Sequence, residues 1–145
     1  MGEIKAKVRL VNLRDTMRFE DGNLPEDRVR VREIEAVADT GAVLTLLPQD
    51  LVEALGLKTL RRVVVQLAND QKIELDLAGG LELTVAGRTV TTDCLVGPPG
   101  CTPLIGQIVM EALDLIADPV KRTLTVRPES PYLPTLNLKR LLVPA

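Results

Sequence analysis

The chain has 145 residues, 46% of them apolar and 26% charged, and its 18 basic and 20 acidic side chains give a net charge of −2. It has no histidine and no tryptophan, one phenylalanine and one tyrosine. The lack of histidine excludes Ser-His-Asp and Cys-His catalysis and every His-ligated metal or haem site. The balanced charge and the scarcity of aromatic side chains argue against a nucleic-acid-binding protein.

The length suits one domain with an aliphatic core. The apolar runs are too short to cross a bilayer, and charges alternate through the first residues, which is not typical of a signal peptide. Cys94 and Cys101 form neither a CxxC motif nor a disulfide framework, and two thiols cannot complete a zinc site. We therefore expect a cytoplasmic protein with free thiols and with no metal, other cofactor, membrane or nucleic-acid partner.

The predicted elements begin with a half-buried strand over residues 4–10, where apolar and charged residues alternate. Residues 14–28 are polar and contain turn residues, which predicts a loop. A second strand over 29–38 becomes continuously apolar before it reaches Asp39. A short helix is predicted over 48–55, because proline stands at its start and glycine follows its last residue.

Two strand patterns flank the sequence Ala68-Asn69-Asp70-Gln71 and predict a long hairpin, since Asn and Asp tolerate positive φ. The elements that follow are a second hairpin with arms 81–85 and 89–96, a loop over 97–103, a short helix over 107–113, and strands over 115–117 and 123–126. Residues 128–145 are rich in proline and predict an extended tail, with the surface of a partner as one place for it to lie. The chain is thus expected to be all-β, mainly β with two short helices, as one domain over 1–127 followed by the tail.

The segment Asp39-Thr40-Gly41 is the most informative one. An ionisable residue ends a strand that otherwise looks buried, and glycine two positions later allows a tight turn. A carboxylate at the mouth of a buried strand is a candidate for catalysis. The plainer interpretation is an aspartate that opens a loop.

The order of the features resembles the retropepsins, the retroviral-type aspartic proteases, and among them single-lobe bacterial relatives. The resemblance covers a core of residues 29–127 and rests on three stretches: the strand that runs into Asp39-Thr40-Gly41-Ala42, the hairpin over 63–77, and Pro103-Leu104-Ile105-Gly106-Gln107. It implies a retropepsin-like closed β-barrel with the acid protease fold, present as a single lobe.

The resemblance also implies roles for particular residues. Asp39, Thr40 and Gly41 would be catalytic, with Thr40 bonding across a pair of such loops, while Ile105 and Gly106 would support the loop from beneath. The substrate would be bound by Ala42 and by the hairpin tip at Ala68, Asn69 and Asp70, acting as a flap. This tip lacks the glycines of the retroviral flap, and Asp70 would disfavour acidic peptides.

Aspartic proteolysis needs two carboxylates around one water, one ionised as the base and one protonated as the acid. The chain has one Asp-Thr-Gly sequence, so we expect a homodimer in which each subunit contributes Asp39 and a peptide or protein substrate is cleaved.

Two alternatives remain open from sequence alone. One is a non-catalytic dimeric module that binds a peptide or protein in the same cleft, and the other is an unrelated β-barrel with a chance motif. The two cysteines are expected to be buried or incidental thiols rather than nucleophiles, because no basic partner is evident. Tyr132 is expected to make a docking contact.

Overall fold

The computed structural model describes residues 3–144 of the chain. Its elements in chain order are β1 (Lys5–Asn12), α1 (Leu13–Glu20), the 3-10 helix η1 (Glu26–Arg28), β2 (Val31–Ala38), β3 (Thr45–Pro48), α2 (Gln49–Leu55), β4 (Lys58–Gln66), β5 (Lys72–Val85), β6 (Arg88–Gly97), β7 (Leu104–Ile105), α3 (Gln107–Ala112), β8 (Leu115–Asp118) and β9 (Thr123–Val126).

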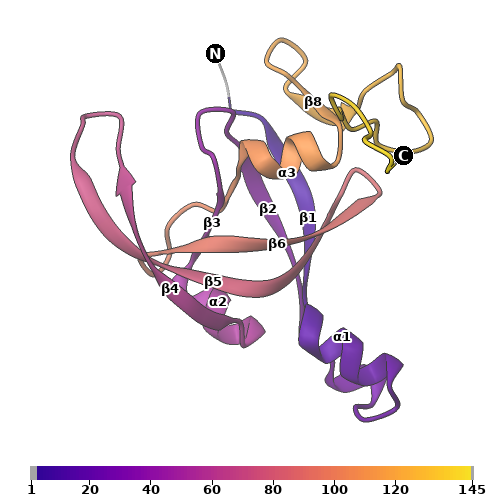
Figure 1. Ribbon diagram of the computed structural model, residues 1–145. Helices are drawn as coiled ribbons and strands as arrows, with labels where there is room; N and C mark the ends of the chain where they lie inside the picture. The colour runs from indigo at the N-terminus through magenta and orange to yellow at the C-terminus, as the bar shows by residue number, and fades with distance from the viewer. Residues whose placement is uncertain (1–2, 145) are drawn as a thin grey trace.

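The main sheet closes on itself through its first strand (Figure 1). Strand β1 pairs antiparallel with β2 and also with β5, so the ring runs β1-β2-β7-β3-β6-β5 and returns to β1. Strand β4 lies outside the ring as the second arm of a hairpin with β5. Strands β8 and β9 form a separate two-stranded ladder. The prediction of a mainly β chain with a closed sheet is confirmed.

The core fills the inside of this ring with aliphatic side chains. In β1, Val8 and Leu10 are buried while Lys7 and Arg9 are exposed, as the alternating sequence predicted. Helices α2 and α3 each add two buried apolar residues to the core. The largest side chains that are fully buried are mostly leucines: Leu10, Leu47, Leu55, Leu77, Leu81 and Leu83. Each contributes about 1.5–3 kcal/mol by leaving water.

The segment predicted as a loop over 14–28 is a helix followed by a 3-10 turn, so the expectation of two short helices was wrong. The side chain of Asn12 caps α1 by accepting the Asp15 N–H at 3.0 Å. The Asp15 carboxylate is buried and accepts the Arg30 Nε–H at 2.8 Å. This contact ties the start of α1 to the residue just before β2. No apolar side chain of α1 is buried, and the polar composition of the segment is what led to the loop prediction.

The sequence also predicted a break between two hairpins where the structure has one continuous strand. Strand β5 runs through Gly79 and Gly80, and its register shifts between Ala78 and Leu81. Gly80 has a φ of 79°, which a bulge of this kind requires. A β-carbon on Gly79 would lie 2.6 Å from the Asp93 carboxylate. The glycines therefore bend one long strand rather than end it.

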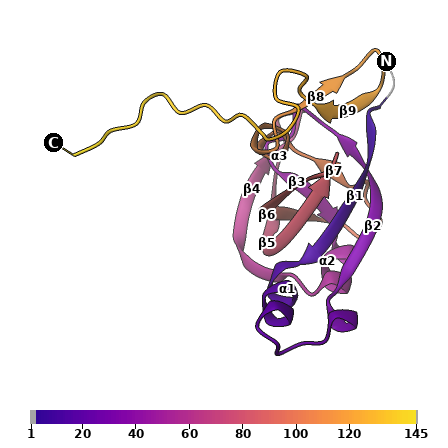
Figure 2. The same cartoon turned by 90° about the vertical axis from the view of Figure 1, so that its right-hand side faces the viewer.

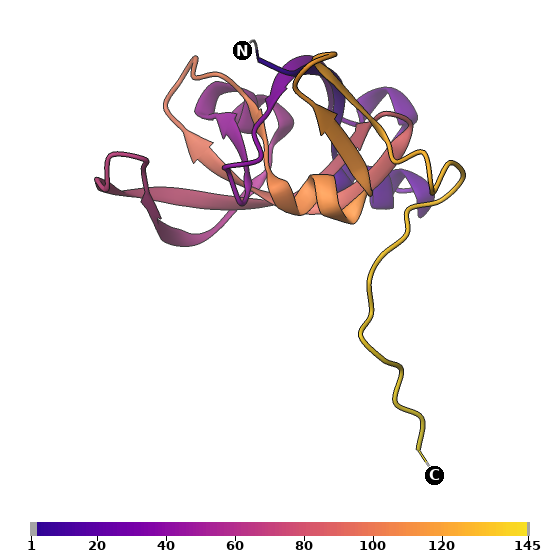
Figure 3. The same ribbon diagram turned by 90° about the horizontal axis from the view of Figure 1, so that it is seen from above.

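Helix α2 ends as predicted, because Gly56 adopts the left-handed conformation with a φ of 65°. After β9, the chain is held to the body by hydrogen bonds of Ser130 and Thr135 with Asp114, and residues 136–144 form an extended arm. Figures 2 and 3 both show this arm leaving the body on the side where α3 lies. Among residues 3–144, no helix has the length and apolar character needed to cross a membrane.

Candidate active site

Asp39 follows directly after β2 and is fixed to the sheet by its backbone. Its N–H donates to the Ile105 carbonyl at 3.0 Å, which continues the parallel pairing of β2 with β7. The residue is half-buried, while Thr40 and Gly41 are exposed. The aspartate thus leaves the sheet at the end of an inner strand pair, with its carboxylate at the surface.

The turn that follows is held by the aspartate itself. The Gly41 N–H donates to Asp39 Oδ1 at 2.9 Å, and the Ala42 N–H donates to the Asp39 carbonyl at 3.1 Å. A β-carbon on Gly41 would lie only 3.2 Å from Oδ1. Within residues 3–144, Oδ2 of this carboxylate accepts no hydrogen bond, so it is free to bind a water molecule or substrate.

The start of α3 supports the loop from beneath. The Gln107 N–H donates to the Ala42 carbonyl at 2.7 Å, and the Ile108 N–H donates to the Val43 carbonyl at 3.1 Å. Gly106 packs against the backbone of Leu44, as expected from the sequence, and a β-carbon there would lie 2.4 Å from the Leu44 carbonyl carbon. Two segments that are 62 to 65 residues apart in the chain thus share one rigid unit.

Two large apolar side chains and one hydroxyl are exposed on this loop and on the start of α3 that supports it. The side chains of Val43 and Ile108 are 67% and 45% exposed, and Thr40, the residue after Asp39, is exposed as well. The Thr40 hydroxyl has no hydrogen-bond partner in the part of the chain that the structure describes. We call Thr40, Val43 and Ile108 the loop face; the sequence analysis singled out only the first of them.

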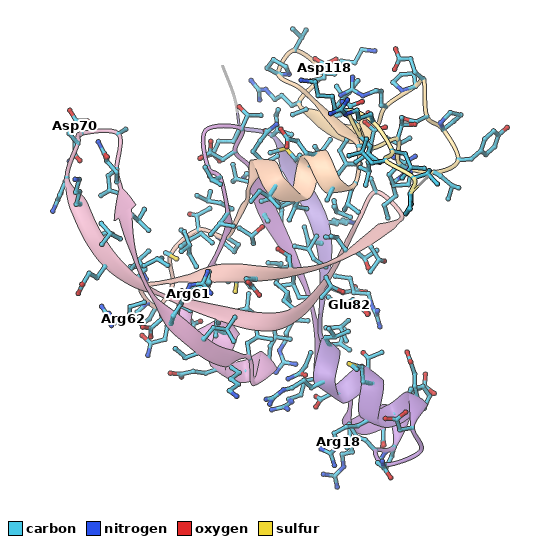
Figure 4. All side chains as sticks on the ribbon, viewed as in Figure 1. Arg18, Arg61, Arg62, Asp70, Glu82 and Asp118 are labelled. Carbon is cyan, nitrogen blue, oxygen red and sulfur yellow. The ribbon has the colours of Figure 1, made fainter. Side chains whose placement is uncertain are left out.

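The segment expected to act as a flap forms the tip of a hairpin between β4 and β5 (Figure 4). The Leu67 N–H donates to the Gln71 carbonyl at 2.8 Å, and Asp70 adopts a φ of 65°, which its short polar side chain tolerates. The Gln66 Nε2–H donates to Asp70 Oδ1 at 3.2 Å. Residues 67–71 are all exposed.

Within one chain, the predicted site residues form two groups rather than one. Asp39, Thr40, Gly41 and Ala42 share the loop after β2, whereas Ala68, Asn69 and Asp70 lie at the far end of the hairpin (Figures 1 and 4). No hydrogen bond joins the two groups among residues 3–144.

The two faces of the hairpin differ in chemistry. On one face the cross-strand pairs Val63–Leu75 and Val65–Ile73 place half-buried aliphatic side chains side by side. On the other face Arg62 pairs with Asp76 at 3.2 Å and with Glu74 at 3.7 Å. These exposed ion pairs stabilise the hairpin little. The aliphatic face is the one that can gain free energy by covering its side chains with a bound molecule.

The two thiols lie outside this arrangement. Burial, with a smaller effect of Asp93, raises the pKa of the Cys94 thiol to about 12. Burial and the nearby Asp50 also raise the pKa of Cys101. A thiol held in its protonated form is a poor nucleophile, which agrees with the sequence-based expectation. In the described part of the chain, no three side chains of the His, Cys, Asp and Glu types gather as they would to hold a metal ion.

Comparison with known families gives one match. A family model described as aspartyl protease matches residues 16–109, which is more than half of the chain. The matched span contains the loop after β2, the whole β4–β5 hairpin and Gly106. A search of curated proteins found no significant match to the sequence.

Proposed function

The chain belongs to the aspartyl protease family, and from this premise we propose that it is a retropepsin-like endopeptidase whose active site forms between two copies of the chain. In this proposal each subunit supplies one Asp39 carboxylate, and the two face each other across a two-fold axis. The observation that carries the proposal is the Asp39 loop: one carboxylate oxygen accepts no hydrogen bond within residues 3–144, and the turn that carries it is anchored to β7 and to the start of α3.

Peptide hydrolysis by such a pair follows from ordinary acid–base chemistry. Two neighbouring carboxylates repel each other, so one is ionised and one protonated. The ionised Asp39 takes a proton from the bound water, whose oxygen attacks the carbonyl carbon, while the protonated Asp39 donates to the carbonyl oxygen. In the next step a proton passes to the amide nitrogen, and the carbon–nitrogen bond breaks.

Two features that are incomplete in one copy of the chain support the need for a second copy. One chain provides one Asp-Thr-Gly sequence, so it cannot hold the base and the acid at the same time. The loop face also lacks a cover, since Val43 on the Asp39 loop and Ile108 at the start of α3 expose large apolar side chains. A second loop face packed against the first would bury these side chains and give the Thr40 hydroxyl a partner.

The β4–β5 hairpin is proposed as the flap that closes over the substrate. Its aliphatic face, formed by Val63, Val65, Ile73 and Leu75, suits extended peptides with aliphatic side chains. Its exposed tip at Ala68, Asn69 and Asp70 would contact the peptide on closure and exclude water from the site.

The direct test is cleavage of a diverse peptide library between pH 3 and pH 7 by the wild type and by Asp39→Asn. We expect the wild type to cleave and the variant to lose at least about a thousandfold in kcat/KM. Asp27→Asn is the matched control, because it removes a carboxylate from the exposed turn η1 and should keep full activity. Cleavage at the wild-type rate by Asp39→Asn would exclude the proposal.

A mixing experiment tests the shared site separately. If wild-type chains are refolded together with a ninefold excess of Asp39→Asn chains, most wild-type chains pair with inactive ones, and activity per wild-type chain should fall about tenfold. A site contained in one chain would show no loss. Peptide binding without cleavage by the wild-type dimer would instead support the non-catalytic binding module.

A further inference from the structure

One row of side chains crosses the sheet from β2 to β4. The strand registers place one residue of each strand directly opposite a residue of the next: Val37, Leu104, Leu46, Leu95, Leu77 and Arg61. Residues that lie directly opposite each other are on the same face of a sheet. The row therefore consists of five aliphatic side chains followed by a guanidinium, and we call these six residues the leucine row.

The leucine row faces away from the core that fills the ring. Its neighbours in the chain are buried in that core: Ala38, Leu47, Ala78 and Cys94. Successive side chains of a strand point to opposite faces, so the row lies on the other face of the sheet. Leu77 is buried within the row, its other aliphatic members are half-buried, and Arg61 is exposed. The row is thus an aliphatic strip that is partly open to solvent.

The row begins beside the Asp39 loop. Asp39 comes two residues after Val37, and its N–H continues the pairing of β2 with β7 by donating to the Ile105 carbonyl. The alternation along β2 therefore places the Asp39 side chain on the face of Val37 and of the leucine row. The row connects the Asp39 loop with the base of the β4–β5 hairpin.

Arg61, at the other end of the row, has no partner for its charge. Within residues 3–144 its guanidinium forms no ion pair and donates no hydrogen bond. Its neighbour Arg62, on the other face of the hairpin, pairs with both Glu74 and Asp76. Figure 4 shows the two arginines on β4, far from the hairpin tip at Asp70. The two adjacent cations thus differ in that only Arg61 is available to a bound molecule.

The surrounding charges leave this end of the row positive. By register, the charged residues nearest to Arg61 on this face are Lys58, which lies opposite Gly79, and Asp93, two residues before Leu95. The Asp93 Oδ1 atom lies 2.6 Å from the position that a β-carbon on Gly79 would take. Among the described residues, neither Lys58 nor Asp93 forms an ion pair. Two cations and one acid therefore favour the binding of a further carboxylate.

We propose that Arg61 determines specificity by binding a carboxylate of the substrate, so that the protein selects peptides with aliphatic residues along the leucine row and an acidic residue at its end. The inference rests on the proposed protease function and adds the class of peptide that the protease takes. A guanidinium holds a carboxylate by two parallel hydrogen bonds. The apolar neighbours of Arg61, Val63 along β4 and Leu77 across the pair, reduce the access of water to that contact.

The strand spacing indicates where the acidic residue lies in the peptide. Neighbouring strands are about 4.8 Å apart, so the path from Val37 to Arg61 measures about 24 Å. An extended peptide covers about 3.3 Å per residue, and the two long side chains bridge part of the distance. The acidic residue is therefore expected about five to seven residues from the cleaved bond. Asp70 at the hairpin tip acts on a different part of the peptide, so the preferred charge depends on the position in the peptide.

The first test uses pairs of peptides that differ only by Glu or Gln at one position, which is moved stepwise away from the cleaved bond. At positions about five to seven residues away, the wild type should cleave the Glu peptide with a kcat/KM about three- to fivefold higher. Arg61→Gln should remove this preference without changing cleavage of the Gln peptide, and Arg61→Glu should favour Lys over Gln at the same positions. Arg62→Gln is the matched control and should keep the wild-type preference. High salt should weaken the preference.

The second test measures binding without catalysis. Fluorescein-labelled Glu and Gln peptides are titrated with the Asp39→Asn protein, and fluorescence anisotropy gives the two dissociation constants. We expect the Glu peptide to bind about three- to fivefold more tightly, and we expect the difference to disappear in Asp39→Asn with Arg61→Gln. Because Arg61 is exposed, the melting temperature should not change.

The outcomes separate this inference from the proposed function. Cleavage by the wild type with no Arg61-dependent preference would overturn the inference and leave the protease intact. A preference in binding that depends on Arg61, together with no cleavage by the wild type, would support the inference and remove the protease in favour of the binding module. An equal loss on Glu and Gln peptides in Arg61→Gln would mean that Arg61 supports the hairpin rather than binds a carboxylate, and it would overturn the inference.

Discussion

Gly106 lies so close to Leu44 that a β-carbon on the glycine would sit 2.4 Å from the Leu44 carbonyl carbon and 2.6 Å from its oxygen. Both atoms are backbone and cannot move aside without shifting the loop that carries Asp39. We expect Gly106→Ala to lower the free energy of unfolding by at least about 2 kcal/mol, measured by urea denaturation. At temperatures where the variant is folded, its kcat/KM for peptide cleavage should fall by more than the loss of folded protein explains.

Gly22→Ala provides the comparison. Its surroundings are open, but its φ of +76° is strained for alanine, so it should cost about 1–2 kcal/mol and leave cleavage unchanged. If Gly106→Ala cleaved peptides as well as Gly22→Ala does, the close packing would not be what positions the Asp39 loop for the proposed cleavage.

The Asp114 carboxylate holds the segment after β9 through Arg127, Ser130 and Thr135, and this contact should respond to acid. The Ser130 hydroxyl, the Thr135 N–H and Arg127 together lower the pKa of this carboxyl from 3.8 to about 2. The folded state therefore binds the proton less tightly than the unfolded chain, and the carboxylate stabilises the fold above about pH 4. This stabilisation should be lost as the pH falls from about 4 towards 2.

Thermal unfolding of Asp114→Asn across this range checks the prediction. At pH 7 the variant should melt a few degrees below the wild type, and the two should converge near pH 2. Glu129→Gln removes an exposed carboxylate from the same segment and should track the wild type throughout. A gap between Asp114→Asn and the wild type that is constant down to pH 2 would contradict the role of the charge.

The two cysteines should differ in reactivity in the folded protein. Cys94 is 0% exposed and its pKa is raised to about 12, so a thiol reagent at pH 8 should leave it unmodified. Cys101 is partly exposed but also has a raised pKa, so it should react slowly. Both should react in denaturant, and Cys101→Ser should abolish the reaction of the folded protein. Rapid modification of Cys94 would mean that the barrel opens readily.

Asp70 at the hairpin tip predicts a bias against acidic peptides if the hairpin acts as a flap. A charge pair about 6 Å apart near water interacts by about 0.7 kcal/mol, which is about threefold in rate. We expect Asp70→Asn to raise kcat/KM for a glutamate-containing peptide about threefold relative to its glutamine counterpart. Asparagine tolerates the positive φ at this position. The gain should shrink at high salt, and an equal gain on both peptides would point to flap mobility rather than charge.

Local patterns in the sequence were sufficient for most strands and for the site loop. The alternation in β1, the proline and glycine that bound α2, and the aspartate at the end of β2 each depend on residues within one or two turns. The same holds for the hairpin tip, where Asn69 and Asp70 determine the turn.

The remaining features depend on contacts between distant residues. Helix α1 has a polar sequence and buries no apolar side chain, and it is held by the contact of Asp15 with Arg30, which lies 15 residues further along the chain. The long strand β5 crosses two glycines because β4 pairs with it up to Gly79, and β1 and β6 pair with it from Leu81 on. The hydrogen bond between Ser130 and Asp114 forms only after the chain has folded back, and no sequence motif predicts it. In the sequence Val43 and Ile108 are ordinary apolar residues, and only the structure shows that their side chains are exposed.

The closure of the ring has a consequence for how the protein is made. Strand β1 finds its first partner, β2, as soon as residue 38 has left the ribosome, but its second partner, residues 81–84 of β5, is synthesised much later. Until then one edge of β1 is open to pairing with another nascent chain. Fragments that end before residue 81 should therefore aggregate. A chain that stops after Thr135 keeps both partners of β1 and should not aggregate for this reason.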